Sequence, residues 1–347
     1  MPRAGYATLA GLFFPNPMDM NVLTEKDASL DPVQGKTIAV IGYGAQGRAQ
    51  AIMMHKTGLD VVVGCREGGS SWSKVQADGL KVASIADAAA QAQIIHILLP
   101  DEVQKEIYES EIKPHLAPGK TLSFSHGFNI VFKRVVPTEG VDVIMVAPKS
   151  PGTEELKEYE RGFGVPALIA IHTDASGSAK DTALAMAHAM RFTRASVLEC
   201  SFEDETYEDL FGEQTVLCGG AAELVKYGFE VLTEAGYPPA MAYFECLHEL
   251  KLIVDLMYEG GLEHMWDVVS NTAEFGGRTI GPKIIDASIK ERMRAALKDV
   301  ESGKFADDWM ADYEAGLPLL KKLRAEQKDH PIEKTGAEVR ALFRKGV

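Results

Sequence analysis

Two pairs of acidic side chains have the spacing of ligands in a metal site. Asp209 and Glu213 are four residues apart, and so are Glu245 and Glu249. In a helix both members of such a pair leave the same face, where like charges destabilise the helix by about 0.2–0.5 kcal/mol unless a cation offsets them. Carboxylate oxygens without a Cys or His cluster suit Mg²⁺ rather than zinc. The alternative is a solvated acidic surface, because residues 203–213 contain six acids.

The residues around these acids favour the metal site. Asp209 and Glu213 enclose Leu210–Gly212, and the second pair lies within the largely apolar segment Tyr243–Leu250. Carboxylates among large apolar residues are expected to be buried, and a buried carboxylate needs a partner. The spacing alone does not decide between the two interpretations.

A glycine-rich segment has the pattern of a dinucleotide-binding loop. Gly42-Tyr43-Gly44-Ala45-Gln46-Gly47 reads GxGxxG, follows an apolar run and opens a helical stretch. The first glycine permits the turn, the second lets the backbone approach a pyrophosphate, and the third lets the helix pack on the strand. Such loops also occur at ordinary strand–helix junctions, but this position near the start of an α/β domain favours a dinucleotide.

The end of the next apolar run bears on which dinucleotide is used. Arg66, Ser70 and Ser71 suit the 2′-phosphate of NADP, because they can form charge-assisted hydrogen bonds with it. Glu67 favours the free 2′-hydroxyl of NAD instead. An exposed polar turn with no ligand is the third interpretation. We expect NADPH, with NADH as the alternative.

Reactive side chains follow two further apolar runs. His126 and Lys149 are expected at the carboxyl ends of strands, where open α/β sheets bind their ligands. Taken singly, His126 would be a structural histidine and Lys149 a solvent-facing lysine. Together they favour catalysis beside a nicotinamide. Ser270 precedes a helical stretch and by position alone is an N-cap. A segment after another strand is expected to cover the cofactor: Asp101, Glu102, Val103 and Gln104.

Short apolar runs alternate with helical stretches over residues 37–200. The runs are nearly unbroken, which is typical of strands buried on both faces of a parallel sheet. Their alternation with helices such as Ala45–Thr57 and Gly177–Met190 predicts a doubly wound α/β domain. The seven runs are Thr37–Gly42, Leu59–Gly64, Ile94–Pro100, Thr121–Ser125, Val141–Ala147, Ala167–Ile171 and Ala195–Leu198.

Only helical patterns follow. Long helices are predicted over Gln214–Ala235, Ala240–Tyr258 and Ser288–Ser302, with breaks at residues 236–239, 260–261 and 276–278. We therefore divide the chain into an N-terminal extension (1–19), a dinucleotide-binding domain (20–200) and an all-helical domain (201–347).

Composition narrows the class of protein. The 347 residues include 36 basic and 50 acidic side chains, and the resulting net charge of −14 argues against nucleic acid or an anionic membrane as a partner. No run reaches the roughly 20 apolar residues of a membrane helix. The four cysteines, Cys65, Cys200, Cys218 and Cys246, are scattered without paired spacing, which predicts a cytoplasmic protein with free thiols.

In their order along the chain, these motifs resemble those of ketol-acid reductoisomerase (acetohydroxyacid isomeroreductase) in its short class I form. The resemblance extends from about residue 31 to about residue 316. Its motifs are GKTIAVIGYGAQG (35–47), PDEVQ (100–104), HGFNI (126–130), APKSPG (147–152), DLFGEQ (209–214), FECLHELK (244–251) and SNTAEFG (270–276).

The resemblance implies roles for individual residues. Asp209, Glu213, Glu245 and Glu249 would bind two Mg²⁺ ions, with Glu249 also counted as catalytic. His126 and Lys149 would be catalytic, and Ser270 would bind the substrate carboxylate. The cofactor contacts would be the glycine loop, Arg66, Ser70, Ser71, residues 101–104 and Gly152. The family usually has serine where this chain has Gly69, so one phosphate donor is absent and NADH is an alternative cofactor.

The resemblance also implies the reaction and the assembly. The substrates would be 2-hydroxy-2-methyl-3-oxo acids, namely 2-acetolactate or 2-aceto-2-hydroxybutyrate, in valine and isoleucine biosynthesis. Alkyl migration would precede hydride transfer from the nicotinamide. The helical domains of two subunits would interlock in a knotted, obligate homodimer, with assembly to a dodecamer as a further option. The rivals are a metal-independent NADP-dependent hydroxyacid dehydrogenase and a nucleotide-binding redox sensor without catalysis.

Overall fold

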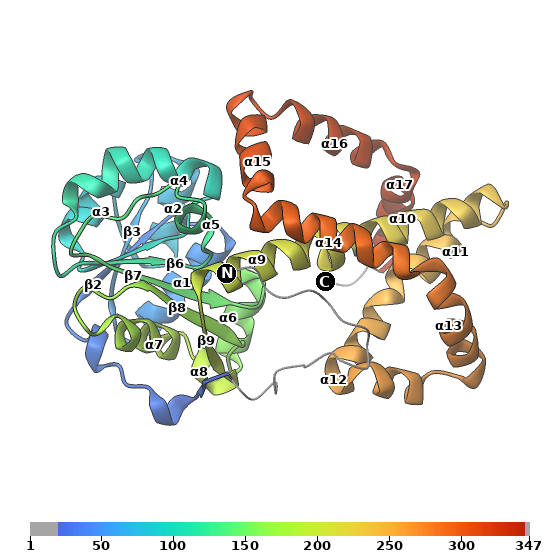
Figure 1. The fold of residues 1–347 in the computed structure, drawn as a ribbon, viewed down its shortest axis with the longest axis horizontal. Coiled ribbons are helices and arrows are strands. Elements are labelled where there is room, and N and C mark those ends of the chain that lie inside the picture. The colour runs from blue at the N-terminus through green and yellow to red at the C-terminus, as the bar shows by residue number, and fades with distance from the viewer. Residues whose placement is uncertain (1–19, 344–347) are drawn as a thin grey trace. The chain divides into compact units, whose positions relative to one another are not determined.

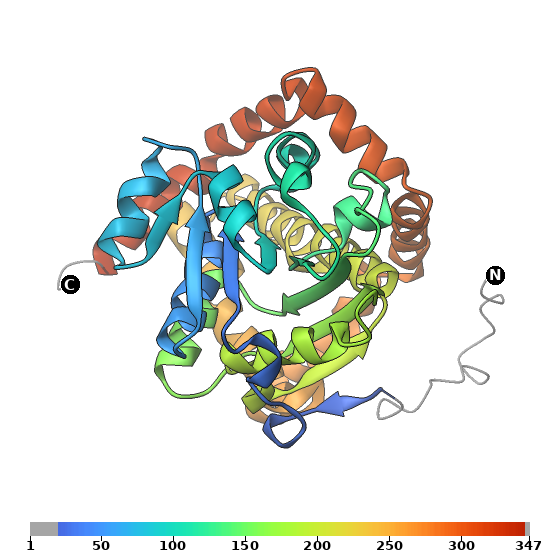
Figure 2. The same cartoon turned by 90° about the vertical axis from the view of Figure 1, so that its left-hand side faces the viewer.

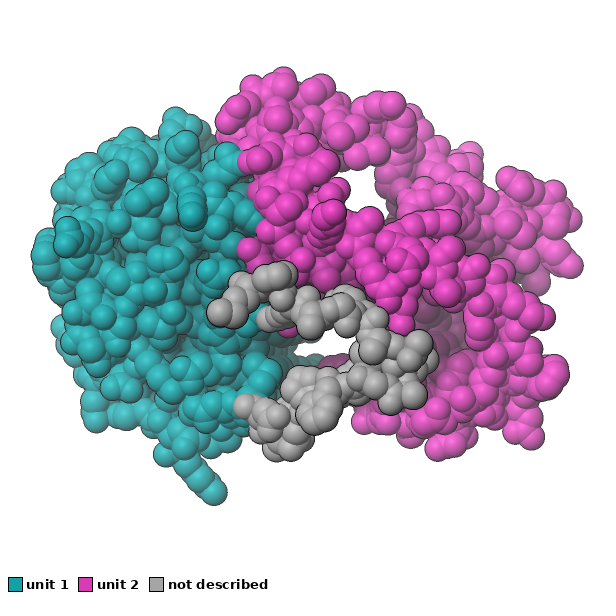
Figure 3. All heavy atoms as spheres, viewed as in Figure 1, with its two compact units in different colours: residues 1–206 teal, residues 207–347 magenta. Residues whose placement is uncertain are grey.

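The computed structural model describes residues 20–343, so the predicted extension over residues 1–19 lies outside the described part. The chain forms two compact units, one ending at Thr206 and the other starting at Tyr207 (Figure 3). This division falls within a helix, whereas the division predicted from the sequence falls after residue 200. Each unit is described by itself.

The first unit is built on a nine-stranded sheet in the described residues, ordered β1-β9-β8-β7-β6-β5-β2-β3-β4 (Figures 1 and 2). The strands are β1 (Val22–Leu23), β2 (Thr37–Ile41), β3 (Asp60–Gly64), β4 (Lys81–Ala83), β5 (Ile94–Ile97), β6 (Thr121–Phe124), β7 (Asp142–Pro148), β8 (Ala167–Thr173) and β9 (Val197–Cys200). Six of the seven predicted runs match strands, and the seventh is shifted, because Phe192–Ala195 is the short helix α8.

The sheet is mixed, whereas the unbroken apolar runs are typical of strands in a parallel sheet. β8 runs antiparallel to β7, and β1 runs antiparallel to β9. Strand direction is set by the connections, and an unbroken apolar run looks the same in either direction. The strands β4, β3, β2, β5, β6 and β7 are parallel, so their carboxyl ends lie at one edge of the sheet.

Helices cover both faces of this sheet, which confirms the doubly wound class. Along β2, Ile38 and Val40 join one core with α1 and α7, while Ala39 and Ile41 join the other core with α3. Burying each large aliphatic side chain contributes roughly 1.5–3 kcal/mol. The helices are α1 (Ala45–Lys56), α2 (Ser70–Ala77), α3 (Ile85–Gln91), α4 (Asp101–Ile107), α5 (Phe128–Val131), α6 (Gly152–Glu160), α7 (Ala179–Ala189), α8 (Phe192–Ala195) and α9 (Phe202–Gly212).

The second unit is all helical where it is described. After the end of α9 it contains α10 (Gly219–Glu234), α11 (Pro239–Tyr243), α12 (Leu250–Val268), α13 (Asn271–Ile284), α14 (Ala287–Glu301), α15 (Lys304–Glu314), α16 (Pro318–Asp329) and α17 (Pro331–Phe343). Its buried cluster is small and centres on Val225, Phe229 and Tyr243. No helix within residues 20–343 is long and apolar enough to cross a bilayer.

The predicted helix breaks have mixed outcomes. Gly236, at φ 89°, separates α10 from α11 as expected, and Gly261, at φ 85°, kinks α12. The break predicted at residues 276–278 is wrong, because α13 continues through it. Glycine costs a helix interior roughly 1 kcal/mol but does not have to end it. Short π-helical segments at Glu213–Leu217 and Phe244–His248 also interrupt stretches predicted as regular helix.

Candidate functional site

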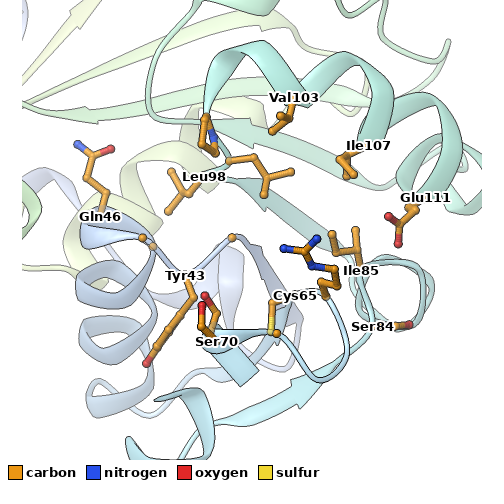
Figure 4. A pocket seen from close by; sticks show the side chains of 18 of the residues that line it. Tyr43, Gln46, Cys65, Ser70, Ser84, Ile85, Leu98, Val103, Ile107 and Glu111 are labelled. Carbon is orange, nitrogen blue, oxygen red and sulfur yellow. The ribbon is translucent and has the colours of Figure 1, made fainter. Parts of the chain in front are cut away.

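A cavity of about 810 Å³ lies at the carboxyl edge of the sheet in the first unit. Figure 4 shows Gln46 at one end of it and Ser84 and Glu111 at the other, with Tyr43 and Ser70 opposite Leu98 and Val103. Of the predicted cofactor contacts, the lining includes Gly42, Tyr43, Gly44, Ala45, Gln46, Gly47, Arg66, Ser70, Ser71 and Val103. Asp101, Glu102, Gln104 and Gly152 are not among the lining residues.

The three glycines of the loop differ in what surrounds them. A Cβ on Gly42 would lie 2.7 Å from the carbonyl oxygen of Leu98, and one on Gly47 would lie 2.3 Å from the carbonyl oxygen of Gly42. Gly42 also has φ 102°, a conformation that other residues rarely adopt. A Cβ on Gly44 would meet nothing within 4 Å. Gly42 and Gly47 are therefore required by the turn, whereas the open space beside Gly44 can admit a ligand at the N-terminus of α1.

Polar residues after β3 form another wall of the cavity. Arg66, Glu67, Ser70 and Ser71 all line it, so the residues of this wall include a cation, a carboxylate and two hydroxyls. Gly69 is the N-cap of α2, and a Cβ there would lie 3.0 Å from the carbonyl oxygen of Arg66. The wall thus offers groups suited to a phosphate and one group suited to a free hydroxyl.

The segment after β5 braces this cavity. Gln104 is buried and donates to the carbonyl oxygen of Leu99 at 2.8 Å and to Asp101 Oδ1 at 3.2 Å. Asn129 donates to the carbonyl oxygen of Asp101 at 3.0 Å. Asp101 and Gln104 therefore fix the shape of the loop, and Val103 is the residue of α4 that faces the cavity with Ile107.

Gly152 supports the glycine loop from behind. A Cβ on Gly152 would lie 2.6 Å from the backbone nitrogen of Gln46 and 2.6 Å from the carbonyl carbon of Ala45. Only a glycine lets α6 approach the first turn of α1 so closely. The predicted role of Gly152 as a cofactor contact is thus accompanied by direct packing on residues that line the cavity.

His126 and Lys149 meet on a carboxylate that the sequence analysis did not single out. Glu205 Oε2 lies 3.1 Å from His126 Nδ1, and Glu205 Oε1 lies 2.7 Å from Lys149 Nζ. His126 follows β6, Lys149 follows the neighbouring β7, and Glu205 is on α9. The one available signal was spacing, because Glu205 lies four residues before Asp209.

Glu205 is 2% exposed. Burial raises the pKa of its carboxyl, but hydrogen bonds and charge from His126 and Lys149 outweigh burial and hold the pKa below the ordinary value. Glu205 is therefore ionised at neutral pH and holds Lys149 Nζ in a fixed position. This cluster can deliver or hold a proton at the sheet edge where the dinucleotide loop also lies.

A close approach of α9 to β6 makes the cluster geometrically feasible. A Cβ on Gly127 would lie 2.2 Å from Thr206 Oγ1 and 3.1 Å from the carbonyl oxygen of Phe202. The absence of a side chain at Gly127 lets α9 reach the end of β6 and bring Glu205 against His126.

The predicted metal ligands lie at irregular helical turns. Asp209 is on α9, and Glu213 begins the π-helical segment Glu213–Leu217. Glu245 lies in the π-helical segment Phe244–His248, and Glu249 follows it directly. π-Helical turns are rare and often occur at functional sites. Among the described residues, no group of three or more potential metal ligands includes Glu245 or Glu249.

Glu205 and Asp209 lie one turn apart on α9, with carboxylate oxygens within 4.8 Å of one another. Ser270 is the N-cap of α13 and accepts a hydrogen bond from the backbone N–H of Ala273 at 3.2 Å. Its hydroxyl proton can still be donated to a ligand. The donor set of carboxylates fits Mg²⁺ in type, because hard cations prefer oxygen ligands.

Comparisons with known proteins match both halves of the chain. Residues 32–196 match the family model described as acetohydroxy acid isomeroreductase, NADPH-binding domain, and residues 202–345 match ketol-acid reductoisomerase, C-terminal domain. The chain belongs to the ketol-acid reductoisomerase family. This confirms the resemblance and the fold class, and the family's activity is a step of branched-chain amino acid biosynthesis.

Individual relatives agree with the family models over nearly the whole chain. Ketol-acid reductoisomerase (NADP(+)) of Akkermansia muciniphila is 58% identical over 324 residues, covering 93% of this chain and 99% of that protein. Ketol-acid reductoisomerase (NAD(+)) of Uncultured archaeon GZfos26G2 is 56% identical, covering 93% and 99%. These two relatives are named for different cofactors.

Solved structures support the same family. The structure of NADH-preferring ketol-acid reductoisomerase from an uncultured archean has a TM-score of 0.91 and 55% identity, covering 94% of this chain and all of that one. A putative oxidoreductase from Jannaschia sp. CCS1 has a TM-score of 0.59 at 14% identity, which shows a shared fold alone. The reductoisomerase interpretation therefore prevails over the dehydrogenase and sensor alternatives.

Proposed function

We propose that the chain converts 2-acetolactate or 2-aceto-2-hydroxybutyrate into 2,3-dihydroxy-3-methyl acids, with a reduced nicotinamide and two Mg²⁺ ions. The observation that carries this proposal is the cluster of Lys149, Glu205 and His126 at the same sheet edge as the dinucleotide cavity. A plain hydroxyacid dehydrogenase needs a proton donor there but has no use for the acid pairs on α9 and beyond.

The proposed reaction has two steps. In the first, the C2 hydroxyl loses its proton, the alkyl group moves with its electron pair from C2 to C3, and the former C3 carbonyl oxygen gains a proton. In the second, a hydride from the nicotinamide reaches the new C2 carbonyl carbon and a proton reaches its oxygen. Both steps therefore require a group that holds and moves protons beside the substrate oxygens.

Lys149 is suited to that proton transfer. Its Nζ is held 2.7 Å from an ionised carboxylate oxygen of Glu205, so the ammonium form is stabilised and its direction is fixed. We assign Lys149 as the proton carrier at the substrate oxygens and Glu205 as its positioning residue. His126, held by the other oxygen of Glu205, is assigned to the same catalytic group.

The four carboxylates are assigned as metal ligands. Asp209 and Glu213 would hold the ions from one helix, Glu245 and Glu249 from another, and Ser270 would bind the substrate carboxylate. When bound, Mg²⁺ would lower the pKa of the substrate alcohol and stabilise negative charge on the neighbouring oxygen.

A second copy of the chain is the proposed source of Glu245 and Glu249. Large apolar side chains of the second unit are exposed in the single chain, including Tyr258 at 89%, Phe275 at 74% and Leu217 at 70%. Exposed apolar surface of this extent is typical of an interface rather than of a free surface. We propose an interlocked homodimer as the active form, located in the cytoplasm, and leave the dodecamer as a further prediction.

The first test is turnover of purified protein with 2-acetolactate and NADPH, with and without Mg²⁺. We expect oxidation of NADPH that requires Mg²⁺ and disappears in Glu245→Gln. Turnover without Mg²⁺, or full turnover by the variant, would contradict the metal assignment and favour a dehydrogenase. Substituting Glu259, an exposed acid on α12, with glutamine provides the matched control.

Mixed dimers test the shared site directly. Asp209→Asn and Glu245→Gln subunits are each expected to be inactive as homodimers. If the two acid pairs of one site come from different subunits, a mixed dimer contains one doubly altered site and one intact site. Co-expression should then restore activity to about a quarter of wild type, whereas ligands from a single chain would give none.

A further inference from the structure

Glu155 is a buried carboxyl group beneath the proposed cofactor loop. It is 1% exposed, and neither of its carboxyl oxygens has a hydrogen-bond partner among the described residues. Burying an unpaired carboxylate is costly, and an apolar side chain would fill the same space without that cost. Packing alone therefore does not explain why this buried position is occupied by an acid.

The packing of α6 on α1 fixes where this carboxyl lies. The buried face of α6 consists of Gly152, Glu155 and Tyr159. Gly152 touches the Ala45–Gln46 peptide at one end, and the Tyr159 hydroxyl lies 3.0 Å from Thr57 Oγ1 at the other. Glu155 lies between these two contacts, facing the first half of α1.

Two glutamine amides on α1 act on this carboxyl. The amides of Gln50 and Gln46 lower the pKa of Glu155 and so oppose the larger effect of burial, although neither makes a hydrogen bond to the carboxyl in this structure. Gln50 is already engaged, because its Oε1 lies 2.7 Å from Nε2 of the buried His96 and its Nε2 donates to Ser125 Oγ at 3.4 Å. Gln46 lines the cavity (Figure 4), so an interaction with Gln46 would connect Glu155 to the proposed cofactor site.

The protonation state of Glu155 decides what Gln46 can present to the cavity. A neutral acid donates its proton to an amide oxygen, whereas a carboxylate accepts from an amide N–H. In the first case the N–H groups of Gln46 remain free for an anionic ligand. In the second case its oxygen faces the cavity, and a negative charge lies below the space where the pyrophosphate would bind.

We propose that Glu155 is a positioning residue of the cofactor site: as a neutral acid it orients the amide of Gln46 to donate to the cofactor, so that cofactor binding carries a proton onto Glu155. The inference rests on the proposed use of this cavity by NADPH or NADH. Burial raises the pKa of Glu155 to about 8, so without cofactor the group is expected to titrate in a range that experiments can reach.

The other titratable groups of these elements can be separated from Glu155. Arg48 is paired with Asp78, and Lys56 is paired with Glu160. Burial lowers the pKa of His96 to about 4, so His96 stays neutral above pH 7. The remaining titratable groups are His55 on α1, Arg161 directly after α6, and Glu154, Lys157, Glu158 and Tyr159 on α6, of which only Tyr159 is buried.

The test is the dissociation constant of NADPH, measured by calorimetry on the full-length protein from pH 7 to pH 9.5. Because the acid stays neutral in the complex and has a pKa of about 8 without cofactor, linkage predicts binding that weakens roughly thirtyfold over this range. Glu155→Gln should bind with nearly constant affinity, because its amide cannot ionise. Glu154→Gln, which alters the exposed acid paired with Lys157 on the same helix, should keep the wild-type slope.

Two further measurements make the result decisive. At pH 8.5, calorimetry in two buffers of different ionisation enthalpy should show proton uptake by the wild type, a measurement that requires no variant. NADH should give the same slope, because it has the same pyrophosphate. Since NADH lacks the 2′-phosphate, this result would exclude titration of that phosphate as the cause of the slope. A wild-type slope in Glu155→Gln, or no proton uptake, would overturn the inference. Failure of the wild type to bind either cofactor at pH 7 would instead contradict the proposed cofactor site.

Discussion

The ammonium group of Lys149 lies 2.7 Å from Glu205, a carboxylate on a helix that begins more than fifty residues later in the sequence. The other oxygen of Glu205 lies 3.1 Å from the ring of His126. One buried acid therefore fixes two groups that come from neighbouring strand ends. Because Glu205 is almost inaccessible to solvent, both contacts act in a medium of low dielectric, where charge-assisted hydrogen bonds are strong.

Glu205→Gln should lower kcat strongly while leaving the cofactor site intact. The amide keeps the shape of the carboxylate but carries no negative charge to stabilise the Lys149 ammonium. It also has only one oxygen, so it cannot accept hydrogen bonds from Lys149 and His126 with two separate oxygens. We expect a loss of roughly 10²-fold or more in kcat with a nearly unchanged dissociation constant for NADPH. Glu203→Gln, at an exposed position on the same helix, is the control. Normal turnover by Glu205→Gln would show that Glu205 does not belong to the proton-transfer group.

The glycine loop could be predicted from the sequence because its chemistry is local. The turn at Gly42, the helix start and the approach of Gly47 all involve residues within one short segment. Glu205 could not be singled out, since its burial depends on how α9 meets the ends of β6 and β7. The sequence also did not reveal that β8 is antiparallel, because an apolar strand has the same pattern in either direction.

Alanine substitutions should separate the structural glycines from the ligand-facing one. A Cβ on Gly44 has open space and its φ is −76°, so Gly44→Ala should fold with a nearly unchanged melting temperature. The added methyl group would occupy the space next to the helix N-terminus, and NADPH binding should weaken about tenfold or more. Thermal unfolding and cofactor titration measure the two effects.

Gly47→Ala should behave in the opposite way. Its Cβ would lie 2.3 Å from a carbonyl oxygen, so the backbone must shift, at a cost of roughly 1–3 kcal/mol in the free energy of unfolding. If Gly44→Ala were the less stable of the two variants, the assignment of the open space to a ligand would be wrong.

Cofactor preference should respond to Glu67. Glu67 lines the cavity next to Arg66, and a carboxylate there would repel a 2′-phosphate and could accept a hydrogen bond from a 2′-hydroxyl. Glu67→Gln should therefore raise the ratio of kcat/KM for NADPH over NADH by roughly tenfold, and Arg66→Ala should lower it. Glu102→Gln, which lies on α4 outside the lining residues, should leave the ratio unchanged. If the ratio of kcat/KM for NADPH over NADH were the same in all variants, residues other than Glu67 and Arg66 would determine cofactor preference.

The buried His96 predicts a dependence of stability on acid pH. Its Nδ1 lies 2.9 Å from Ser123 Oγ, its Nε2 lies 2.7 Å from Gln50, and burial lowers its pKa from 6.5 to about 4. An unfolded chain takes up this proton near pH 6.5, whereas the folded chain resists it. The stability contributed by neutral His96 is therefore present above pH 6.5 and is lost as pH falls toward 4.

His96→Asn removes this titration. The variant should be less stable than wild type at pH 7.5, because it disrupts the contacts with Gln50 and Ser123. The difference should shrink by up to about 1.4 kcal/mol for each pH unit below 6.5, since only the wild type resists protonation. Unfolding by urea at pH 7.5, 6 and 5 measures the difference, with exposed His55→Asn as the control. A stability difference that stays constant with pH would show that His96 is protonated in the folded protein as readily as in the unfolded chain.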